Sequence, residues 1–184
     1  MNNILASISG IDYLAWLWIF AFAYALHELE EWNILRWYQR NYVEMPPATD
    51  RTIRVWIIFF ILIVFAWCAV ATLPGNPVFA AYAFLPTVAV AIQNSLQHIY
   101  WLFYFKQYAP GVVTSLVLLI PIGLYVTVQA VLQNYVPYWY VIVLALVMFP
   151  GLLQTTKVKN KMTSQMRSIH NLSIKLDQWI GRKV

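Results

Sequence analysis

Long apolar segments constrain the fold of this chain more than any other feature of its sequence. A helix that crosses the hydrocarbon core of a bilayer needs about 20 mostly apolar residues. Five segments approach this length: about Ile11 to Trp37, Ile53 to Leu73, about Phe79 to Phe105, Val112 to Leu132 and Tyr138 to Leu153. Because backbone polar groups must pair internally within a bilayer, the sequence predicts an all-α polytopic membrane helix bundle of about five transmembrane helices.

Composition supports a membrane protein. The chain is 61% hydrophobic and only 10% charged, whereas soluble domains are about a quarter charged. We expect residues 1–155 to form the transmembrane bundle and residues 156–184 to form a basic, amphipathic cytoplasmic helix. The one cysteine, Cys68, lies in an apolar run and is expected to be a small buried side chain.

The basic residues predict the orientation, because cytoplasmic loops are enriched in Lys and Arg. With five spans, all 12 basic residues fall on one side, and the loops "PGNP" and "QNYVP" contain none. These residues are Arg36, Arg40, Arg51, Arg54, Lys106, Lys157, Lys159, Lys161, Arg167, Lys175, Arg182 and Lys183. We therefore expect an inner-membrane protein with its N-terminus outside and its tail cytoplasmic. Topology accounts for the net charge of +5, so no nucleic-acid partner is expected.

The tail repeats apolar residues at helical spacing, from Val158 and Met162 through Met166 to Trp179. A helix with an apolar face and a basic face is typical of an anionic membrane surface; binding of a partner protein is the alternative. On this interpretation His170 is exposed, and no tail residue completes a site in the bundle.

Two predicted spans carry polar residues on one helical face. In "ALHELEEWN", His27, Glu30 and Glu31 share a face because positions three and four apart are neighbours on a helix, while Glu28 points to one side. In "AIQNSLQHIYW", Asn94 and His98 share a face by the same rule. Ionisable residues inside a membrane indicate a functional site.

The two histidines are expected at one depth. At a rise of about 1.5 Å per residue, His27 lies about 13 Å inward of Arg36, and His98 lies about 12 Å inward of Lys106. Both helices run in the same direction with five spans, so the two polar faces are expected to meet in the cytoplasmic half of the bilayer.

Two imidazoles with carboxylates point to a divalent transition metal (Zn, Fe or Mn; one or two ions), which offsets the negative charge. Two alternatives stay open. Arg36 or Arg40 could pair with Glu30 or Glu31 in a purely structural network, or Glu and His could relay protons or ions.

Three landmarks resemble one family. "HELEE" fits the motif of the bacterial HXXEE-domain family of small membrane proteins, "NSLQH" resembles its later Asn-x-x-x-His, and "YAPGVVTSLVLLIPIGLY" resembles its Tyr-x-Pro-Gly segment. The landmarks cover roughly residues 20 to 125. The resemblance implies shared polar positions at His27, Glu30, Glu31, Asn94 and His98, and it implies no established activity.

Together these observations predict a metal-dependent membrane enzyme that acts on a lipid or other apolar substrate, by hydrolytic or oxidative chemistry. The expected metal ligands are His27, Glu30, Glu31 and His98. Asn94 would orient a ligand, bind the substrate or donate to an oxyanion. A glutamate that is not a ligand, either Glu28 or one of the Glu30–Glu31 pair, would be the general base. The alternative function is a non-enzymatic protein that conducts protons, ions or a solute, as a homo-oligomer or as a subunit of a larger membrane complex.

The charge pattern yields a topology prediction. A reporter fused after Val184 should read cytoplasmic, and one placed before Ile4 should read outside, because only five spans place every Lys and Arg on one side. A reporter assay with a periplasmic C-terminus would contradict the arrangement.

Overall fold

The computed structural model describes residues 11–45 and 47–181, apart from the side chains of residues 165 and 180. These residues form helices and loops, with no strand among them. The elements are α2 (Tyr13–Glu30), α3 (Ile34–Asn41), α4 (Asp50–Thr72), α5 (Pro77–Phe105), α6 (Val112–Thr114), the π-helical turn η1 (Ser115–Leu119), α7 (Ile120–Leu132), α8 (Tyr138–Val158) and α9 (Ser164–Gly181). The first residues of the predicted outside end, together with Arg182 and Lys183, lie outside this described part.

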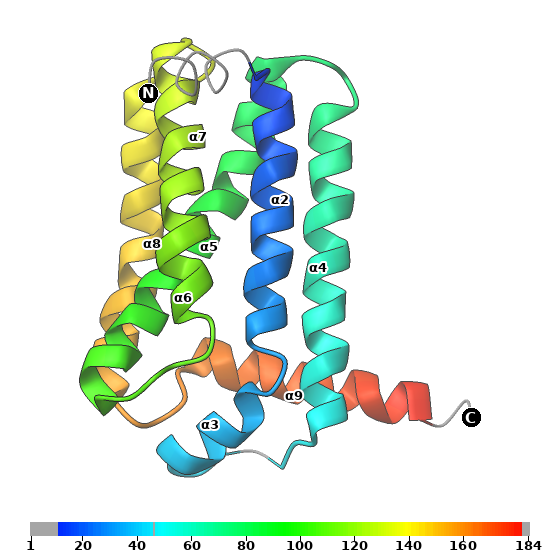
Figure 1. Ribbon diagram of the computed structural model, residues 1–184, viewed down its shortest axis with the longest axis vertical. Coiled ribbons are helices and arrows are strands. Elements are labelled where there is room, and N and C mark those ends of the chain that lie inside the picture. The colour runs from blue at the N-terminus through cyan, green and yellow to red at the C-terminus, as the bar shows by residue number, and fades with distance from the viewer. Residues whose placement is uncertain (1–10, 46, 182–184) are drawn as a thin grey trace.

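Upright helices form a bundle, and two helices lie at one end of it (Figure 1). Four helices are long and apolar enough to cross a membrane: Asp50–Thr72, Pro77–Phe105, Val112–Leu132 and Tyr138–Val158. The α2 helix stands beside them but is not one of the four, and its last turn holds His27, Glu28 and Glu30. The all-α bundle with membrane-type helices is thus confirmed. Of the five predicted spans, four correspond to described helices that are long and apolar enough to cross a membrane.

The first predicted helix is interrupted. We expected one helix from about Ile11 to Trp37, but α2 ends at Glu30 and α3 begins at Ile34, so this prediction is wrong. Arg54 of α4 stabilises the turn between α2 and α3, because its guanidinium donates to Asn33 Oδ1 at 3.0 Å and lies over the Trp32 ring at 5.3 Å. Arg36 therefore lies on a separate helix, and counting residues back from it does not give the depth of His27.

The core lies where α2 packs against α4, α5 and α7. Leu17 and Phe20 of α2 are fully buried, and the Phe20 ring meets the Phe84 ring of α5 edge-on at 6.1 Å. Cys68 is fully buried as expected. Small residues let membrane helices approach closely, and Gly123 provides such a contact because an added Cβ would lie 3.1–3.2 Å from side chains of α2 and α5.

A π-helical turn adjusts the fourth apolar segment. Pro121 has no N–H to bond the preceding turn, and η1 ends two residues before it. π-Helical turns are rare in proteins, and those that occur often lie at functional sites. Here the widened turn begins at Ser115, directly after the residues of α6 that face α2.

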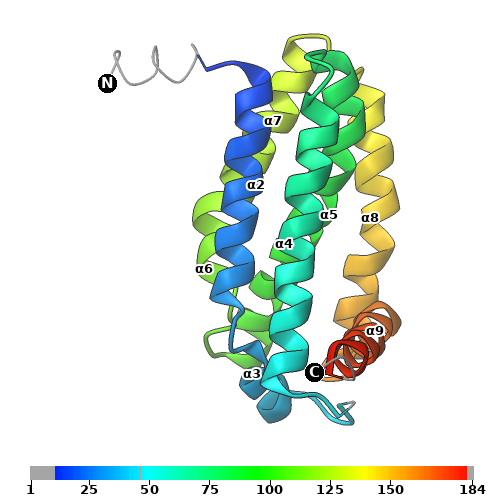
Figure 2. The ribbon, with the colours of Figure 1, turned by 90° about the vertical axis from the view of Figure 1, so that its right-hand side faces the viewer.

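The α9 helix runs across the lower end of the bundle (Figure 1), and Figure 2 shows it nearly end-on below α8. Arg51 Nε lies 3.0 Å from Asp177 Oδ1, and Thr52 Oγ1 donates to Asp177 Oδ2 at 3.1 Å, which joins α9 to the start of α4. The predicted tail helix is therefore present, although residues 156–158 belong to α8.

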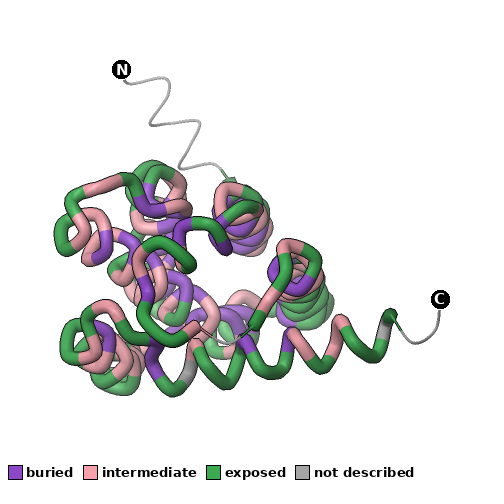
Figure 3. Tube along the Cα trace, turned by 90° about the horizontal axis from the view of Figure 1, so that it is seen from below, coloured by how far each residue is buried: buried purple, intermediate pink, exposed green. Residues whose placement is uncertain are grey.

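One expectation for α9 is wrong. His170 is 5% exposed rather than on the surface, because part of the apolar face of α9 packs on protein. Seen from below, buried residues of α9 alternate with exposed ones where the helix crosses the bundle (Figure 3).

The close packing at Gly123 predicts a stability effect. Gly123→Val should lower the free energy of unfolding by about 1–3 kcal/mol, the usual cost of overfilling a packed interior. Thermal unfolding in detergent measures it. The neighbouring, half-exposed Leu124 provides the control, since Leu124→Ala should change stability by less than about 0.5 kcal/mol. Equal melting of Gly123→Val and wild type would show that α7 does not pack as described.

Candidate metal centre

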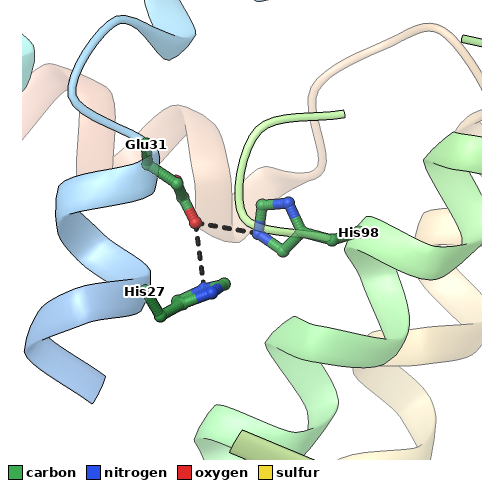
Figure 4. Close-up of side chains that lie close together, drawn as sticks. All are labelled: His27, Glu31 and His98. Carbon is green, nitrogen blue, oxygen red and sulfur yellow. Dashed lines mark ion pairs between the residues drawn. The ribbon is translucent and has the colours of Figure 1, made fainter. Parts of the chain in front are cut away.

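Three side chains from two helices converge on one point. Glu31 Oε1 lies 3.1 Å from His27 Nε2 and 2.9 Å from His98 Nε2 (Figure 4). His27 lies on the last turn of α2, Glu31 directly follows that helix, and His98 lies on α5. One ligand atom from each residue lies within 4.8 Å of the others, so the group could hold a metal ion. The predicted meeting of the two histidines is confirmed, and their ring centroids are 5.1 Å apart.

The group is buried, and no Lys or Arg among the described residues forms an ion pair with Glu31. His27 and His98 are 0% and 1% exposed, and the Glu31 side chain is 13% exposed. Within residues 11–45 and 47–181, neither Arg36 nor Arg40 forms an ion pair with Glu30 or Glu31. The arginine pairing that we kept as an alternative is therefore absent from the described contacts. A buried carboxylate is costly unless a cation or hydrogen bonds compensate it.

The amide of Asn94 bridges the two histidines. Its Nδ2 lies 3.0 Å from His27 Nε2 and 3.3 Å from His98 Nε2. Asn94 thus lies at the same point as the three candidate ligands. Whether Asn94 orients a ligand, binds a substrate or donates to an oxyanion stays a prediction.

The contacts of His27 Nδ1 fix its tautomer. Nδ1 lies 3.1 Å from the carbonyl oxygen of Gly111 and 3.1 Å from Thr114 Oγ1. A carbonyl can only accept, and the Thr114 hydroxyl already donates to Glu30 Oε2 at 2.6 Å. Nδ1 therefore carries the proton and donates it. In the neutral ring, Nε2 then presents a lone pair to the carboxylate of Glu31.

Glu30 faces a different set of partners from those we expected. Its carboxylate accepts hydrogen bonds from Tyr108 Oη at 2.6 Å, from the backbone N–H of Val113 at 3.2 Å, and from the N–H and hydroxyl of Thr114 at 2.8 and 2.6 Å. It therefore caps the start of α6, where helical N–H groups lack partners and favour an anion. Burial, followed by the hydrogen bond to Glu30, raises the pKa of Tyr108 above its ordinary value, so this hydroxyl remains a donor.

A cavity of about 210 Å³ adjoins the centre. Glu31 and Asn94 form part of its wall, and so does Glu28, which is only 6% exposed. Glu28 is not a member of the candidate ligand group, but it borders the space that Glu31 also borders. The rest of the wall is mainly apolar and aromatic, with Trp56, Trp101 and residues of α9.

Sequence reasoning assigned Gly111 to a turn and overlooked its contact with the site. Gly111 has a φ of +91°, and a Cβ there would lie 2.8 Å from His27 Cε1 and 2.9 Å from His98 Cε1. Its backbone therefore packs directly on both imidazoles. The Pro-Gly pair at the start of an apolar segment was the available signal, but a turn explained it equally well. Thr114 and His170 had no signal of comparable strength.

The contact predicts a specific cost for a side chain at position 111. Gly111→Ala should destabilise the protein by about 1–3 kcal/mol more than Gly75→Ala, because only the first adds an overlap in a packed interior. Gly75 also has a positive φ, of +66°, but nothing lies within 4 Å of its added Cβ. The control thus carries the same kind of backbone strain without the contact. Chemical or thermal unfolding measures the difference, and equal losses in the two variants would exclude the packing of Gly111 on the histidines.

Comparison with known proteins identifies the family. The family described as "Protein of unknown function with HXXEE motif" matches residues 18–126, which is more than half of the chain and includes the candidate ligands, Asn94 and Gly111. No curated protein and no solved structure gave a significant match. The chain is therefore a member of the HXXEE family.

Proposed function

We propose that this protein is a metal-dependent integral membrane enzyme whose ion is held by His27, Glu31 and His98. One observation carries the proposal. The lone pair of His27 Nε2 faces a carboxylate oxygen at 3.1 Å, and Nδ1 already holds the proton of the neutral ring. Two acceptors at this distance repel each other unless a cation lies between them, and a divalent ion satisfies both, together with His98.

The distances suit a single ion. Ligand bonds of about 2.0–2.1 Å in tetrahedral geometry separate neighbouring donor atoms by about 3.3 Å. The carboxylate lies 3.1 and 2.9 Å from the two nitrogens, so these two pairs would expand by only a few tenths of an ångström around an ion, and all three ligand atoms lie within 4.8 Å of one another. Two imidazoles and one carboxylate favour Zn, Fe or Mn over softer metal chemistry.

The second shell resembles that of known metal centres. Metal-binding histidines generally donate their other N–H to a carbonyl or a carboxylate, and His27 donates Nδ1–H to Gly111. We therefore reduce the proposed ligand set from four residues to three. Glu30 is not one of the three proposed ligands. Its carboxylate accepts a hydrogen bond from the Thr114 hydroxyl, and that hydroxyl accepts one from His27 Nδ1.

An enzyme is favoured over a closed structural site because the ligand group found among the described residues has three members and lies beside a cavity. Catalytic sites leave a coordination position open, and a divalent ion there would activate water or polarise a carbonyl. Glu28, in the wall of the same cavity, would act as the general base. Asn94 would bind the substrate, because an Nε2 atom that coordinates the ion has no lone pair left for the amide N–H. We place the centre in the cytoplasmic half of the inner membrane, and propose an apolar or lipid-like substrate.

A proton or ion relay is the second candidate, and one observation favours it. A chain of contacts runs from Glu30 to Thr114 at 2.6 Å, from Thr114 to His27 at 3.1 Å, and from His27 to Glu31 at 3.1 Å. A protonated His27 would relieve the repulsion as a metal would. This candidate, in which the chain conducts protons alone or as part of a larger complex, requires no bound transition metal.

Metal content separates the candidates. Protein purified without chelators should contain about one Zn, Fe or Mn per chain by elemental analysis, because its three ligands come from one buried group. His27→Ala, Glu31→Gln and His98→Ala should each lose the ion. Glu30→Gln should retain the site but weaken metal affinity by about 10–100-fold, the usual effect of a second-shell change.

Glu28→Gln is the matched control, because it alters a buried carboxylate of the same helix that is outside the ligand group. It should keep the wild-type metal content. Stoichiometry far below one ion per chain in the wild type for all three metals would reject the metalloenzyme and favour the relay.

A further inference from the structure

The cavity beside the metal centre is closed on one side by α9. Met166, Ile169 and His170 of α9 border it together with Met162, which precedes α9, and so do Glu28, Glu31 and Asn94 of the bundle. Gln97 Nε2 lies 3.2 Å from Met166 Sδ, and Tyr42 Oη lies 4.0 Å from the same atom. The helix that forms this wall crosses the end of the bundle (Figures 1 and 3).

His170 is the unexplained polar group in this wall. The residue is 95% buried, since its exposed fraction is 5%, and its Nε2 has no hydrogen-bond partner among the described residues. Its ring meets only the edge of Tyr38, at a centroid distance of 6.4 Å. Burial lowers the pKa of His170, so the imidazole is neutral near pH 7. A buried polar atom without a partner is costly, and a ligand in the cavity would satisfy it.

Charge narrows the ligand class. Two carboxylates, Glu28 and Glu31, border the cavity, and no Lys or Arg among the described residues does. In the absence of a metal ion this wall offers an anionic head group no positive partner, so an anionic lipid or a fatty acid is disfavoured there.

The volume of the cavity and the chemistry of its wall narrow the class of ligand further. A volume of about 210 Å³ is below the roughly 300–1,000 Å³ of pockets for drug-sized ligands, so a two-chain lipid does not fit. The walls at Trp56, Ile57 and Phe60 are apolar. The space suits one small polar head and the first part of one hydrocarbon chain.

We propose that this cavity is the substrate pocket and binds the uncharged polar head of a single-chain amphiphile, such as a long-chain alcohol, with His170 as a hydrogen-bond partner of that head. The inference rests on the proposed function, because it treats the pocket as belonging to the metal centre. His170 would thus be a substrate-contacting residue supplied by the tail, where we had expected no contribution to the site.

Tryptophan quenching tests the proposal on the full chain. The probes are 6-bromohexan-1-ol and 6-bromohexanoate, which share a chain and a quenching bromine but differ in head-group charge. Trp56 and Trp101 report from the cavity wall. We expect saturable quenching by the alcohol in wild type, and at least about tenfold weaker binding of the carboxylate to the chelator-treated protein, because its charge would be buried there without a partner.

Substitutions of His170 test whether this side chain contacts the head group of the alcohol. His170→Leu should weaken alcohol binding about fivefold, the value of one hydrogen bond. His170→Gln, which keeps a donor and an acceptor, should remain within about twofold of wild type on the same scale. Leu172→Ala, at an exposed position of α9, is the matched control and should bind as wild type does. Trp56→Phe should reduce the saturable amplitude, which locates the probe even if a His170 variant does not fold.

Equal binding of the alcohol by wild type and folded His170→Leu would overturn the proposal. Non-saturable quenching by the alcohol, or tighter binding of the carboxylate than of the alcohol by the chelator-treated protein, would overturn it too. Titrations are run on metal-loaded and chelator-treated protein, with elemental analysis of each sample. Probe binding to a protein that never held metal would therefore reject the proposed function, whereas a metal-loaded protein without probe binding would reject only the pocket.

Discussion

The carboxylate of Glu31 is the constraint on which the site depends. It is buried among apolar helices, and its described ion-pair partners are two histidines rather than Lys or Arg. A charge in such a place requires closely fitted partners, so α2 and α5 must approach with His27 and His98 in register. Gly111 must then pass both rings without a Cβ. One buried oxygen thus fixes the relative positions of α2, α5 and the loop that enters α6.

Two adjacent glutamates join different parts of the bundle. Neighbouring residues on a helix point in directions about 100° apart, so Glu30 and Glu31 cannot face the same group. Glu31 turns to the histidines, whereas Glu30 accepts four hydrogen bonds from Tyr108, Val113 and Thr114. The Glu-Glu pair of the family motif therefore ties the end of α2 both to α5 and to the start of the next apolar segment. The hydroxyl of Thr114 connects the two carboxylates, because it donates to Glu30 and contacts His27, which in turn contacts Glu31.

The sequence allowed a correct prediction of four of the five apolar helices and of the meeting between His27, Asn94 and His98. Hydropathy and the three- and four-residue spacing of a helix are local properties, which explains this success. The position of Glu30 was not predictable in this way, because donors about 80 residues away decide it. The interruption after Glu30 likewise depends on Arg54 of another helix. For α9, an apolar face at helical spacing does not distinguish packing on lipid from packing on protein, and His170 was misplaced for that reason.

The interruption that positions Glu31 also shapes the cavity beside it. After the turn at residues 31–33, α3 takes a new direction and places Ile34 and Tyr38 in the cavity wall. A helix continuous through residue 37 would carry both side chains onward along the axis of α2, away from α9 and from His170, whose ring now meets Tyr38. Residues of α9 then close the space that the change of direction opens. The same local break therefore accounts for a carboxylate that faces two histidines, for an apolar pocket next to it, and for the contribution of a C-terminal helix to that pocket.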